Sequence, residues 1–315
     1  MNKILVTGGA GFIGSNLIKE LIKNDNNKIF VFDNLSTGRL QNLQLQNKKL
    51  SFFQLDLMSK IEDWPVINEL DYIFHFSANA DVSGGAKNRD IDLQQNLLVT
   101  KSVCDYAKIN KSKHLVFASS AAVYGEPEIF PTPEDSRTIQ TSMYGASKLA
   151  SEAFIQAYSE YGDFKSSIFR FVSWIGYGYS HGVIYDFYKK LQFNKSQLDI
   201  LGDGTQRKSF LDVSDGVKGI ISLIKHDTKS EIFNLGHDEI MSVRDLADIV
   251  CNSLEIENIK YNFSGQKRGW IGDSPLVLLD TSKAKSYGWK PKVSIKQGIL
   301  NTINYLQYDK KNIFR

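Results

Sequence analysis

Residues 7–14 read TGGAGFIG, directly after a short apolar run and directly before a segment with apolar residues at helical spacing. Gly8, Gly11 and Gly14 in this stretch have the spacing GxxGxxG. Glycines so placed permit a tight turn and let backbone N–H groups approach a pyrophosphate, where the helix N-terminus adds partial positive charge. The strand before the glycines and the helix after them favour a dinucleotide-binding loop over a chance turn.

Asp33 is the second feature of this expected site. The run KIFVFD, residues 28–33, indicates a strand that ends on Asp33, 19 residues beyond Gly14. A carboxylate there accepts hydrogen bonds from both ribose hydroxyls and repels a 2′-phosphate, which favours NAD over NADP. The alternative is a solvated turn residue, and the nearby Arg39 weighs slightly against the choice of NAD.

The first 172 residues alternate between β-rich and helical runs. Near-continuous apolar strands separated by helices predict a parallel sheet covered on both faces. Right-handed crossovers make it a doubly wound, Rossmann-type α/β fold. Beyond the first strand, the expected strands are residues 28–33, 50–56, 71–78, 114–120 and 166–171, and the expected helices include 15–24, 93–109 and 147–161.

After about residue 172 the pattern changes to a Gly- and Tyr-rich loop, short strands around a Gly-Asp-Gly turn, and further helices. We therefore expect a dinucleotide-binding domain over residues 1–172. Residues 173–315 are expected to form mainly a smaller α/β substrate lobe that covers the mouth of that domain. Residues 210–236 are expected to rejoin the first domain, because the run EIFNLG reads as a strand of the main sheet.

A candidate catalytic set follows the glycine loop along the chain. Tyr144 and Lys148 open a strongly helical run four residues apart, so both face one side. A phenol has an ordinary pKa near 10, and both a neighbouring ammonium and a positive nicotinamide ring favour the phenolate. Tyr144 would then take a proton from a substrate hydroxyl. Ser120, at the end of an expected strand, would hydrogen-bond the reacting oxygen.

A YxxxK pair by itself is more often part of the core or the surface. The glycine loop and the strand that ends in Ser120 favour a catalytic role for Tyr144 and Lys148 here.

Composition excludes several classes of protein. The 315 residues are 42% hydrophobic and 23% charged, with a net charge of +3, so nucleic acid and anionic membranes are not expected partners. No run of 18 apolar residues is present, and the N-terminus does not resemble a signal peptide. Two distant cysteines, Cys104 and Cys251, are expected to be buried and reduced. We expect a cytoplasmic protein.

The remaining titratable residues receive structural roles. His75 lies inside an apolar strand and is expected to be a core histidine. Asp71, Asp90 and Asp92 are expected to be solvated termini or helix caps. The five histidines form no set with carboxylates at metal-ligand spacing, so no metal is expected.

Several motifs together resemble one family. TGGAGFIG, VFDNLSTG, FQLDL, FHFSA, FASSAAVYG and YGASK are similar to the extended short-chain dehydrogenase/reductases. Within these, the chain most resembles the NAD-dependent nucleotide-sugar epimerases of the UDP-glucose 4-epimerase type. GVIYDF, LGDGTQRKSFLDVSD and RGWIGDSPLVLLD resemble the family's second-lobe motifs. The resemblance covers nearly the whole chain and is specific for the family, but it does not name the sugar.

The resemblance implies a set of binding residues. Asp56 and Leu57 would meet the adenine, and Arg207 and Arg268 would clamp the substrate diphosphate, for which the planar guanidinium is suited; surface ion pairs are the alternative for both arginines. The implied NAD contacts are Gly8, Gly11, Phe12, Ile13, Gly14, Asp33, Asn34, Gly38, Asp56, Leu57, Phe76, Ser77, Ala78, Tyr144 and Lys148. The implied contacts to a nucleotide-diphosphate sugar are Ser120, Tyr144, Ser173, Val183, Arg207 and Arg268.

Two departures from the family bear on the reaction. Ser173 and Tyr177 stand where the family has an Asn and a Pro after the sixth strand, so the placement of the substrate is in doubt. Ala121 and Ala122 stand where the 4,6-dehydratase branch has the Asp-Glu pair that expels water, so elimination is set aside.

The leading hypothesis is an epimerase that passes through a transient 4-keto sugar and recycles its NAD. A net C4 dehydrogenase of a UDP-, GDP- or CDP-linked sugar, serving polysaccharide precursor synthesis, is the alternative, because both reactions share their first half. A non-catalytic NAD-binding module is a third reading, against which the presence of Tyr144 and Lys148 counts. The helices expected at residues 93–109 and 147–161 would form a four-helix homodimer interface, as in this family, or be buried against their own sheet.

Overall fold

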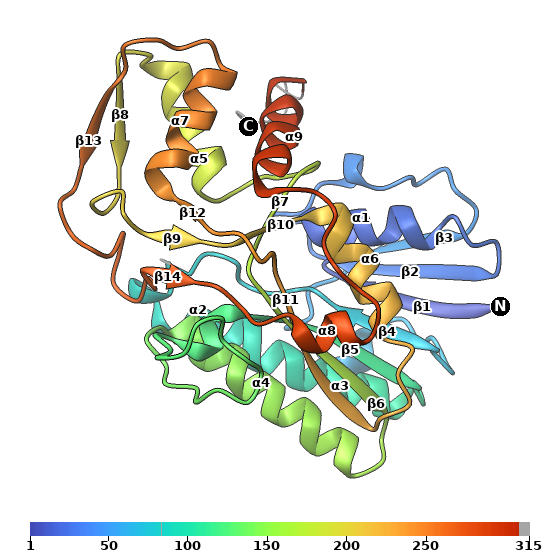
Figure 1. The fold of residues 1–315 in the computed structure, drawn as a ribbon. Coiled ribbons are helices and arrows are strands. Elements are labelled where there is room, and N and C mark those ends of the chain that lie inside the picture. The colour runs from blue at the N-terminus through green and yellow to red at the C-terminus, as the bar shows by residue number, and fades with distance from the viewer. Residues whose placement is uncertain (83, 309–315) are drawn as a thin grey trace.

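The computed structural model describes residues 1–82 and 84–308. Seven parallel strands form the central sheet in the order β11-β6-β5-β4-β1-β2-β3 (Figure 1). The chain runs outward from β1 to β3 and then returns to β4 on the other side of β1, which makes the sheet doubly wound as expected. The strands are β1 (Asn2–Thr7), β2 (Asn27–Asp33), β3 (Leu50–Gln54), β4 (Tyr72–His75), β5 (His114–Ser120), β6 (Lys165–Phe171) and β11 (Ser230–Leu235).

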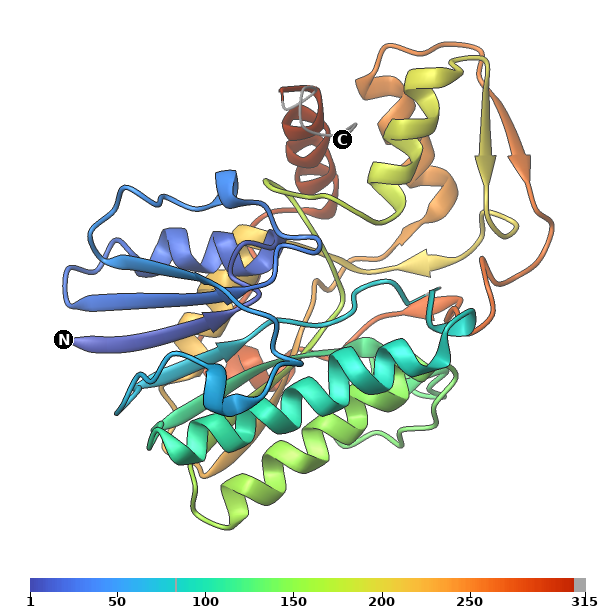
Figure 2. The same ribbon diagram turned by 180° about the vertical axis from the view of Figure 1, so that it is seen from behind.

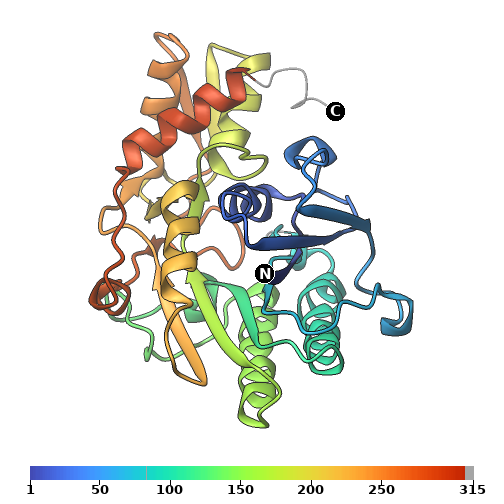
Figure 3. The same cartoon turned by 90° about the vertical axis from the view of Figure 1, so that its right-hand side faces the viewer.

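Helices cover both faces of this sheet, and the alternation of side chains along the strands explains why. Ile4 and Val6 of β1 pack on the face covered by α1 (Phe12–Leu21) and α6 (Val213–Leu223). Leu5 between them packs on the opposite face, against α3 (Val99–Ile109) and α4 (Met143–Glu160). Successive residues of a strand point to opposite faces, so a run of consecutive apolar residues fills two cores at once. Figure 3 shows helices on both sides of the sheet.

A second group of elements lies beyond the carboxyl edge of the sheet (Figure 2). Three helices, α5, α7 and α9, pack against one another there. The chain passes through part of this second group and then returns to the main sheet, where β11 pairs with β6. The elements that follow β6, apart from α6 and β11, are β7 (Ser173–Ile175), α5 (Val183–Phe193), β8 (Gln197–Ile200), β9 (Arg207–Lys208), β10 (Phe210–Asp212), β12 (Met241–Ser242), α7 (Val243–Ser253), β13 (Lys260–Phe263), β14 (Leu276–Val277), α8 (Ser282–Ser286) and α9 (Ile295–Tyr308).

Helix boundaries differ from the expectation in three places, one of which is α4, expected over residues 147–161 and found over Met143–Glu160. The first helix begins at Phe12, directly after Gly11, rather than at residue 15. The segment expected as one helix over residues 93–109 begins with a π-helical turn, η4 (Leu93–Leu98), which follows the short helix α2 (Arg89–Asp92) and precedes α3. Apolar spacing alone does not distinguish a π-helical turn from an α-helical one.

Most predictions for single buried residues hold. Cys104 in α3 and Cys251 in α7 are both buried and unpaired, as expected. His75 is a core histidine, fully buried between the hydroxyls of Thr7 and Thr100. In the part of the chain that the structure describes, no helix is both long and apolar enough to cross a bilayer.

One expectation about a carboxylate is wrong. Asp92 is not a solvated cap but is fully buried, because α2, which ends at Asp92, packs against α4.

The turn between β1 and α1 brings backbone atoms into close contact. A Cβ on Gly14 would lie within van der Waals distance of the Gly8 carbonyl oxygen and 2.7 Å from Gly9 Cα. A Cβ on Gly8, whose φ is +66°, would lie 2.7 Å from the backbone nitrogen of Ser77. The spacing of the glycines therefore reflects contacts between backbone segments that leave no room for a side chain.

Two histidines share one hydroxyl at the amino end of the sheet. Ser167 Oγ lies 2.8 Å from Nε2 of both His114 and His226. A hydroxyl donates only one hydrogen bond, so at most one of the two rings accepts from it and the other ring must donate. Burial lowers the pKa of His114 to about 4, with smaller contributions from His226 and Lys165. Burial also lowers the pKa of His75 to about 3.

Replacing Gly14 by Ala is expected to destabilise the protein by about 1–3 kcal/mol, because the new methyl group must displace backbone atoms. The free energy of urea-induced unfolding measures this effect. Gly269→Ala is the control, since a Cβ there would meet nothing closer than 3.3 Å, and its effect should stay within about 0.5 kcal/mol. Equal stability of the Gly14→Ala variant and the wild type would contradict the role of this turn.

Stability is expected to fall as the pH drops below about 6.5, the ordinary pKa of histidine. Unfolded chains then bind protons on His75 and His114, whereas the folded protein does not until the pH nears their lowered values. Each ring contributes a slope of up to about 1.4 kcal/mol per pH unit, measurable as the unfolding free energy between about pH 7 and about pH 5. His114→Gln should reduce the slope, and a slope that this substitution leaves unchanged would contradict the prediction.

Candidate active site at the carboxyl edge of the sheet

The candidate site lies where the strand order reverses. At the carboxyl ends of β1 and β4 the chain leaves the sheet in opposite directions, which opens a crevice in folds of this type. Phe76 N donates to Thr7 O over 3.1 Å, which holds the segment after β4 beside the glycine turn. Ser77 and Ala78 continue this segment and are half-buried. The segment therefore flanks the glycine turn, as the resemblance implies.

The glycine turn has the features of an anion site. No side chain caps the N-terminus of α1, and its first turn contains no acidic residue. The backbone N–H groups of Phe12 and Ile13 have no hydrogen-bond acceptor within residues 1–82 and 84–308. Such unpaired N–H groups and the helix dipole favour a bound phosphate. The turn therefore fits a dinucleotide pyrophosphate, with the close glycine contacts leaving space for it.

Asp33 lies at the other end of this site. Its carboxylate is buried and accepts from Ala10 N at 2.9 Å and Leu35 N at 2.8 Å. Gly38 packs directly on it, since a Cβ there would lie 2.8 Å from Asp33 Oδ1. Asn34 is half-buried beside it. Each carboxylate oxygen retains a further lone pair, so this arrangement fits a ribose diol.

The two residues expected at the adenine differ in exposure. Asp56 is exposed, and its carboxylate accepts from Met58 N at 2.9 Å. Leu57 is buried in the core on the α3 and α4 face of the sheet. A contact between Leu57 and an adenine would therefore involve mainly its backbone.

Helix α4 carries two members of the expected catalytic set. Ser142 caps the helix by accepting from Gly145 N, which sets the first turn with Tyr144. Lys148 is buried, donates to Ala118 O at 2.8 Å, and lies 5.9 Å from the centroid of the Tyr144 ring. The side chain of Ser120, at the end of β5, is close enough to the Tyr144 phenol to influence its pKa. The fold therefore brings all three residues together from two separate elements.

Burial controls the ionisation of this set. It raises the pKa of Tyr144 to about 12, an effect that the hydrogen bond with Ser120 opposes and the charge of Asp92 increases. Burial lowers the pKa of Lys148 to about 8, while the carboxylates of Glu152 and Asp92 act in the opposite direction. Deprotonation of the phenol at neutral pH therefore needs further positive charge beside it.

A buried ion pair joins α4, the helix that carries Tyr144 and Lys148, to the central sheet. Arg170 in β6 donates from Nη2 to Glu152 Oε2 over 2.7 Å and from Nε to Oε1 over 3.0 Å. Ser119 in β5 donates to the same carboxylate, and Arg170 Nη1 donates to Tyr124 Oη over 2.9 Å. The phenol of Tyr124 donates in turn to Asn234 in β11. This network connects β5, β6 and β11 with α4, and it includes Ser119, the residue directly before Ser120.

The residues implied for the substrate lie on the second group of elements. Arg268 is exposed and forms an ion pair with Glu126, in the loop after β5. Arg207 in β9 is also exposed and has no ion pair within the described chain. Ser173 begins β7 and is exposed, and Val183 begins α5. Within the described residues, no hydrogen bond or ion pair joins these four side chains to one another or to Tyr144.

Lys208 was missed by the sequence reasoning. It is the neighbour of Arg207, and successive strand residues point to opposite faces. Lys208 Nζ lies 2.6 Å from Asp273 Oδ1 and 5.9 Å from the centroid of the Trp270 ring. It therefore faces the loop that carries Arg268, while Arg207 faces solvent.

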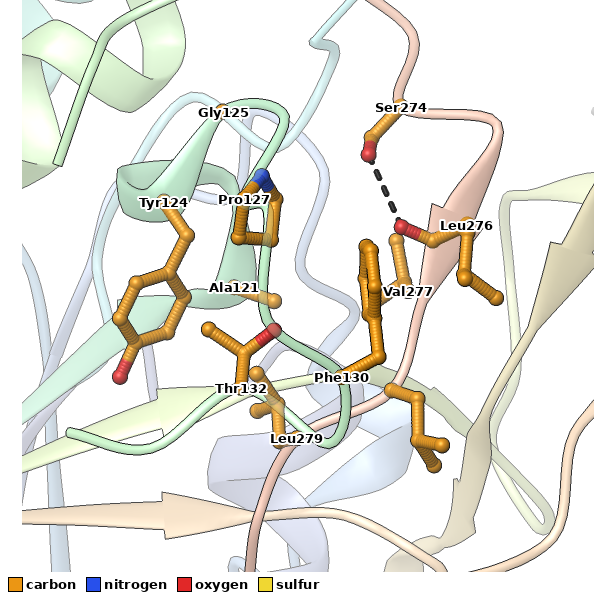
Figure 4. A pocket seen from close by; sticks show the side chains of 11 residues that line it. Ala121, Tyr124, Gly125, Pro127, Phe130, Thr132, Ser274, Leu276, Val277 and Leu279 are labelled. Atoms are coloured by element: carbon orange, nitrogen blue, oxygen red, sulfur yellow. Dashed lines mark hydrogen bonds between the residues drawn. The ribbon is translucent and has the colours of Figure 1, made fainter. Parts of the chain in front are cut away.

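The domain built on the central sheet and the second group of elements also meet at a small cavity (Figure 4). It lies between the loop after β5 and the strand β14, where Tyr124, Phe130 and Thr132 face Val277 and Leu279. Its volume is about 10 Å³, roughly one water molecule. This contact is therefore packing that joins the two groups and not a ligand site.

Comparison with known proteins agrees with this architecture. The model of the NAD dependent epimerase/dehydratase family matches residues 4–236. A crystal structure of a UDP-galactose 4-epimerase is 31% identical, with a TM-score of 0.87, and covers 98% of this chain and 99% of that chain. The UDP-glucose 4-epimerase of Thermotoga maritima, solved with UDP-glucose, is 27% identical, also with a TM-score of 0.87, over 97% of this chain and 99% of that chain.

A relative with a different reaction is almost as similar. The human dTDP-D-glucose 4,6-dehydratase is 29% identical over 317 residues, which are 96% of this chain and 89% of that protein. From the matched family model, the common fold and the NAD-compatible glycine turn, this chain belongs to the NAD-dependent epimerase/dehydratase family, as an enzyme of the extended short-chain dehydrogenase/reductase type.

Proposed function

We propose that this chain is a nucleotide-sugar 4-epimerase in which Tyr144, Lys148 and Ser120 are the catalytic residues. The observation that carries the proposal is that Ser120, at the end of β5, and Lys148, in α4, both act on the Tyr144 side chain, with Lys148 Nζ 5.9 Å from the centroid of its ring. These side chains lie at the carboxyl edge of a sheet whose glycine turn fits a dinucleotide. Solved structures similar to this chain are named as epimerases of UDP-sugars, which supports a UDP-linked substrate.

Each residue has a separate task in the proposed mechanism. When bound, NAD accepts a hydride from C4 of the sugar and returns it to the opposite face. Tyr144 takes the C4 hydroxyl proton as that hydride leaves and gives it back on reduction. Ser120 donates to the same oxygen and holds it against the phenol. Lys148 stabilises the phenolate as a buried ammonium.

Two paired cations on the second group of elements support a diphosphate substrate. Arg268 forms an ion pair with Glu126, and Lys208 forms one with Asp273. A guanidinium or ammonium that exchanges such a partner for a diphosphate keeps its charge compensated. We propose that Arg268 and Lys208 bind the substrate diphosphate, with Arg207 as the residue at the rim.

Two alternatives share the same catalytic set. Ala121 and Ala122 directly follow Ser120 and carry no acid or base, so elimination of water lacks its catalysts. A net dehydrogenase would use the same first half-reaction and then release the keto sugar. Tyr177, one of the departures from the family pattern, packs against Tyr305 with a centroid distance of 4.7 Å and an angle of 58° between the rings. This contact gives it a packing role and favours neither reaction.

We also propose that the chain has two functional lobes. Residues 1–172 bind the cofactor and are rejoined by about residues 210–236, and the rest of residues 173–315 mainly binds the substrate. The packing of α6 on α1 and of β11 on β6 supports this division. Residues 309–315 lie outside the described residues.

The quaternary structure we propose is a homodimer formed by α3, α4 and the turn before them. Leu98, the last residue of η4 directly before α3, and Phe154, in the middle of α4, are 44% and 43% exposed although both are large and apolar. The two helices pack side by side, so together they offer one broad surface (Figure 1). Exposed apolar surface of this kind is typical of subunit interfaces.

The reaction is tested by incubating the protein with UDP-, GDP- and CDP-sugars without added cofactor. An isomeric product without lasting absorbance in the NADH band supports the epimerase. Accumulated NADH with a keto sugar, and a need for an acceptor before a second turnover, would instead identify the dehydrogenase. No turnover of any sugar would contradict both.

Tyr144→Phe is expected to lower turnover by about 10²–10⁴-fold, because the proton acceptor is lost. The affinity for NAD, measured by calorimetry, should be unchanged. Tyr161→Phe, at the exposed C-terminus of the same helix, is the matched control and should retain full activity. Activity of the Tyr144→Phe variant close to that of the wild type would rule out this mechanism.

Phe154→Glu is expected to convert the dimer into a monomer, because a buried unpaired charge opposes association. Sedimentation velocity measures the change in mass. Phe193→Glu, at the end of α5 where the side chain is 78% exposed, should leave the mass unchanged, because α5 packs against α7 and α9. A wild-type protein that sediments as a monomer at all concentrations would overturn the proposal.

A further inference from the structure

A buried carboxylate lies beside the catalytic set without an assigned role. Asp92, the last residue of α2, is fully buried and takes part in no ion pair within the described chain. Its Oδ1 accepts from Asn79 Nδ2 over 2.9 Å and from Asn96 Nδ2 over 3.1 Å. Its Oδ2 has no hydrogen-bond partner in the described chain. Gly85 packs so closely on Oδ2 that any side chain at Gly85 would collide with it.

Asn96 connects the Asp92 carboxylate with α4, the helix that carries Tyr144 and Lys148. Asn96 Nδ2 donates to Ser147 Oγ over 2.9 Å as well as to Asp92. Ser147 lies between Tyr144 and Lys148 in α4, and its hydroxyl donates to Tyr144 O over 2.8 Å. The π-helical turn η4 carries Asn96, and such turns often occur at functional sites. The link therefore ends on the backbone of the proposed catalytic tyrosine.

Asp92 is also the unneutralised carboxylate near Lys148. Lys148 is buried and is influenced by two carboxylates, Glu152 and Asp92. Glu152 is already held by the guanidinium of Arg170, so its charge is largely compensated. Asp92 forms no ion pair within the described residues. Burial raises its pKa, and the hydrogen bonds from Asn79 and Asn96 and then the charge of Lys148 act in the opposite direction.

The other titratable groups around the two residues come from every neighbouring element. They are His75 in β4, Asp81 in the loop before α2, Tyr144 and Glu152 in α4, and Arg170 in β6.

We propose that Asp92 is a positioning residue that acts on Lys148 by charge and on Tyr144 through Asn96 and Ser147. This inference rests on the proposed function, because it assigns Asp92 a task within that same site. The negative charge keeps Lys148 protonated despite its burial. The hydrogen-bonded link holds the first turns of α4 against η4, so that the phenol stays in register with Ser120.

The charge is tested by NMR on protein with ¹³Cε-labelled lysine, titrated from about pH 6 to about pH 11. The Lys148 resonance is identified by its absence in Lys148→Met. In Asp92→Asn its midpoint should move down by about one pH unit. Asp90→Asn, an exposed neighbour in the same short helix, is the matched control and should not move it. Asp92→Ser serves if the amide variant does not fold.

Activity supplies the second measurement. The alkaline limb of the pH profile of kcat should move down in Asp92→Asn together with the Lys148 midpoint, and it should stay in place in Asp90→Asn. An unchanged Lys148 midpoint in the folded Asp92 variant overturns the proposal, as does a loss of activity that is equal at every pH. If the wild type turns over no sugar, the proposed function fails, and the NMR titration alone still decides the role of Asp92.

Discussion

The buried ion pair between Arg170 and Glu152 is the interaction on which the catalytic end of this molecule depends. Both side chains are at most 5% exposed, and Ser119 and Tyr124 complete their hydrogen bonds. Removing one partner of such a pair leaves a buried charge without compensation. The strands β5 and β6 and the helix α4 therefore keep one arrangement relative to each other, and the residues at their ends share it. Ser120 follows Ser119 directly, so its position is set by this network.

Electrostatics divides the crevice into two parts. At the glycine turn, unpaired N–H groups and an uncapped helix N-terminus present positive potential to an anionic ligand. On the other side, Lys148 and Asp92 are both buried, and each makes the charged form of the other less unfavourable. The first part binds through the backbone, and the second depends on side chains that only the tertiary structure brings together. This difference explains why a glycine motif is easier to recognise than a catalytic environment.

The sequence predicted most of the elements but not all of their details. The strand containing Ser120 and the helix containing Tyr144 lie where alternating and helical patterns indicated, because those patterns report which faces are buried. The π-helical turn η4 was missed, since its apolar spacing resembles that of an α-helix. Asp92 was expected in solvent because a carboxylate in a polar segment is usually exposed. Its burial depends on Asn79 and Asn96, which no local pattern connects with it.

By itself, the sequence determined the doubly wound sheet, the glycine turn and the family, because these follow from local spacing and from backbone contacts that only glycine permits. The tertiary structure alone decided which charges face one another. Arg207 and Lys208 are adjacent in the chain, yet only Lys208 turns toward Asp273, because a strand sends successive side chains to opposite faces. Ion pairing depends on distances of a few ångströms between distant segments, and those distances exist only after the chain has folded.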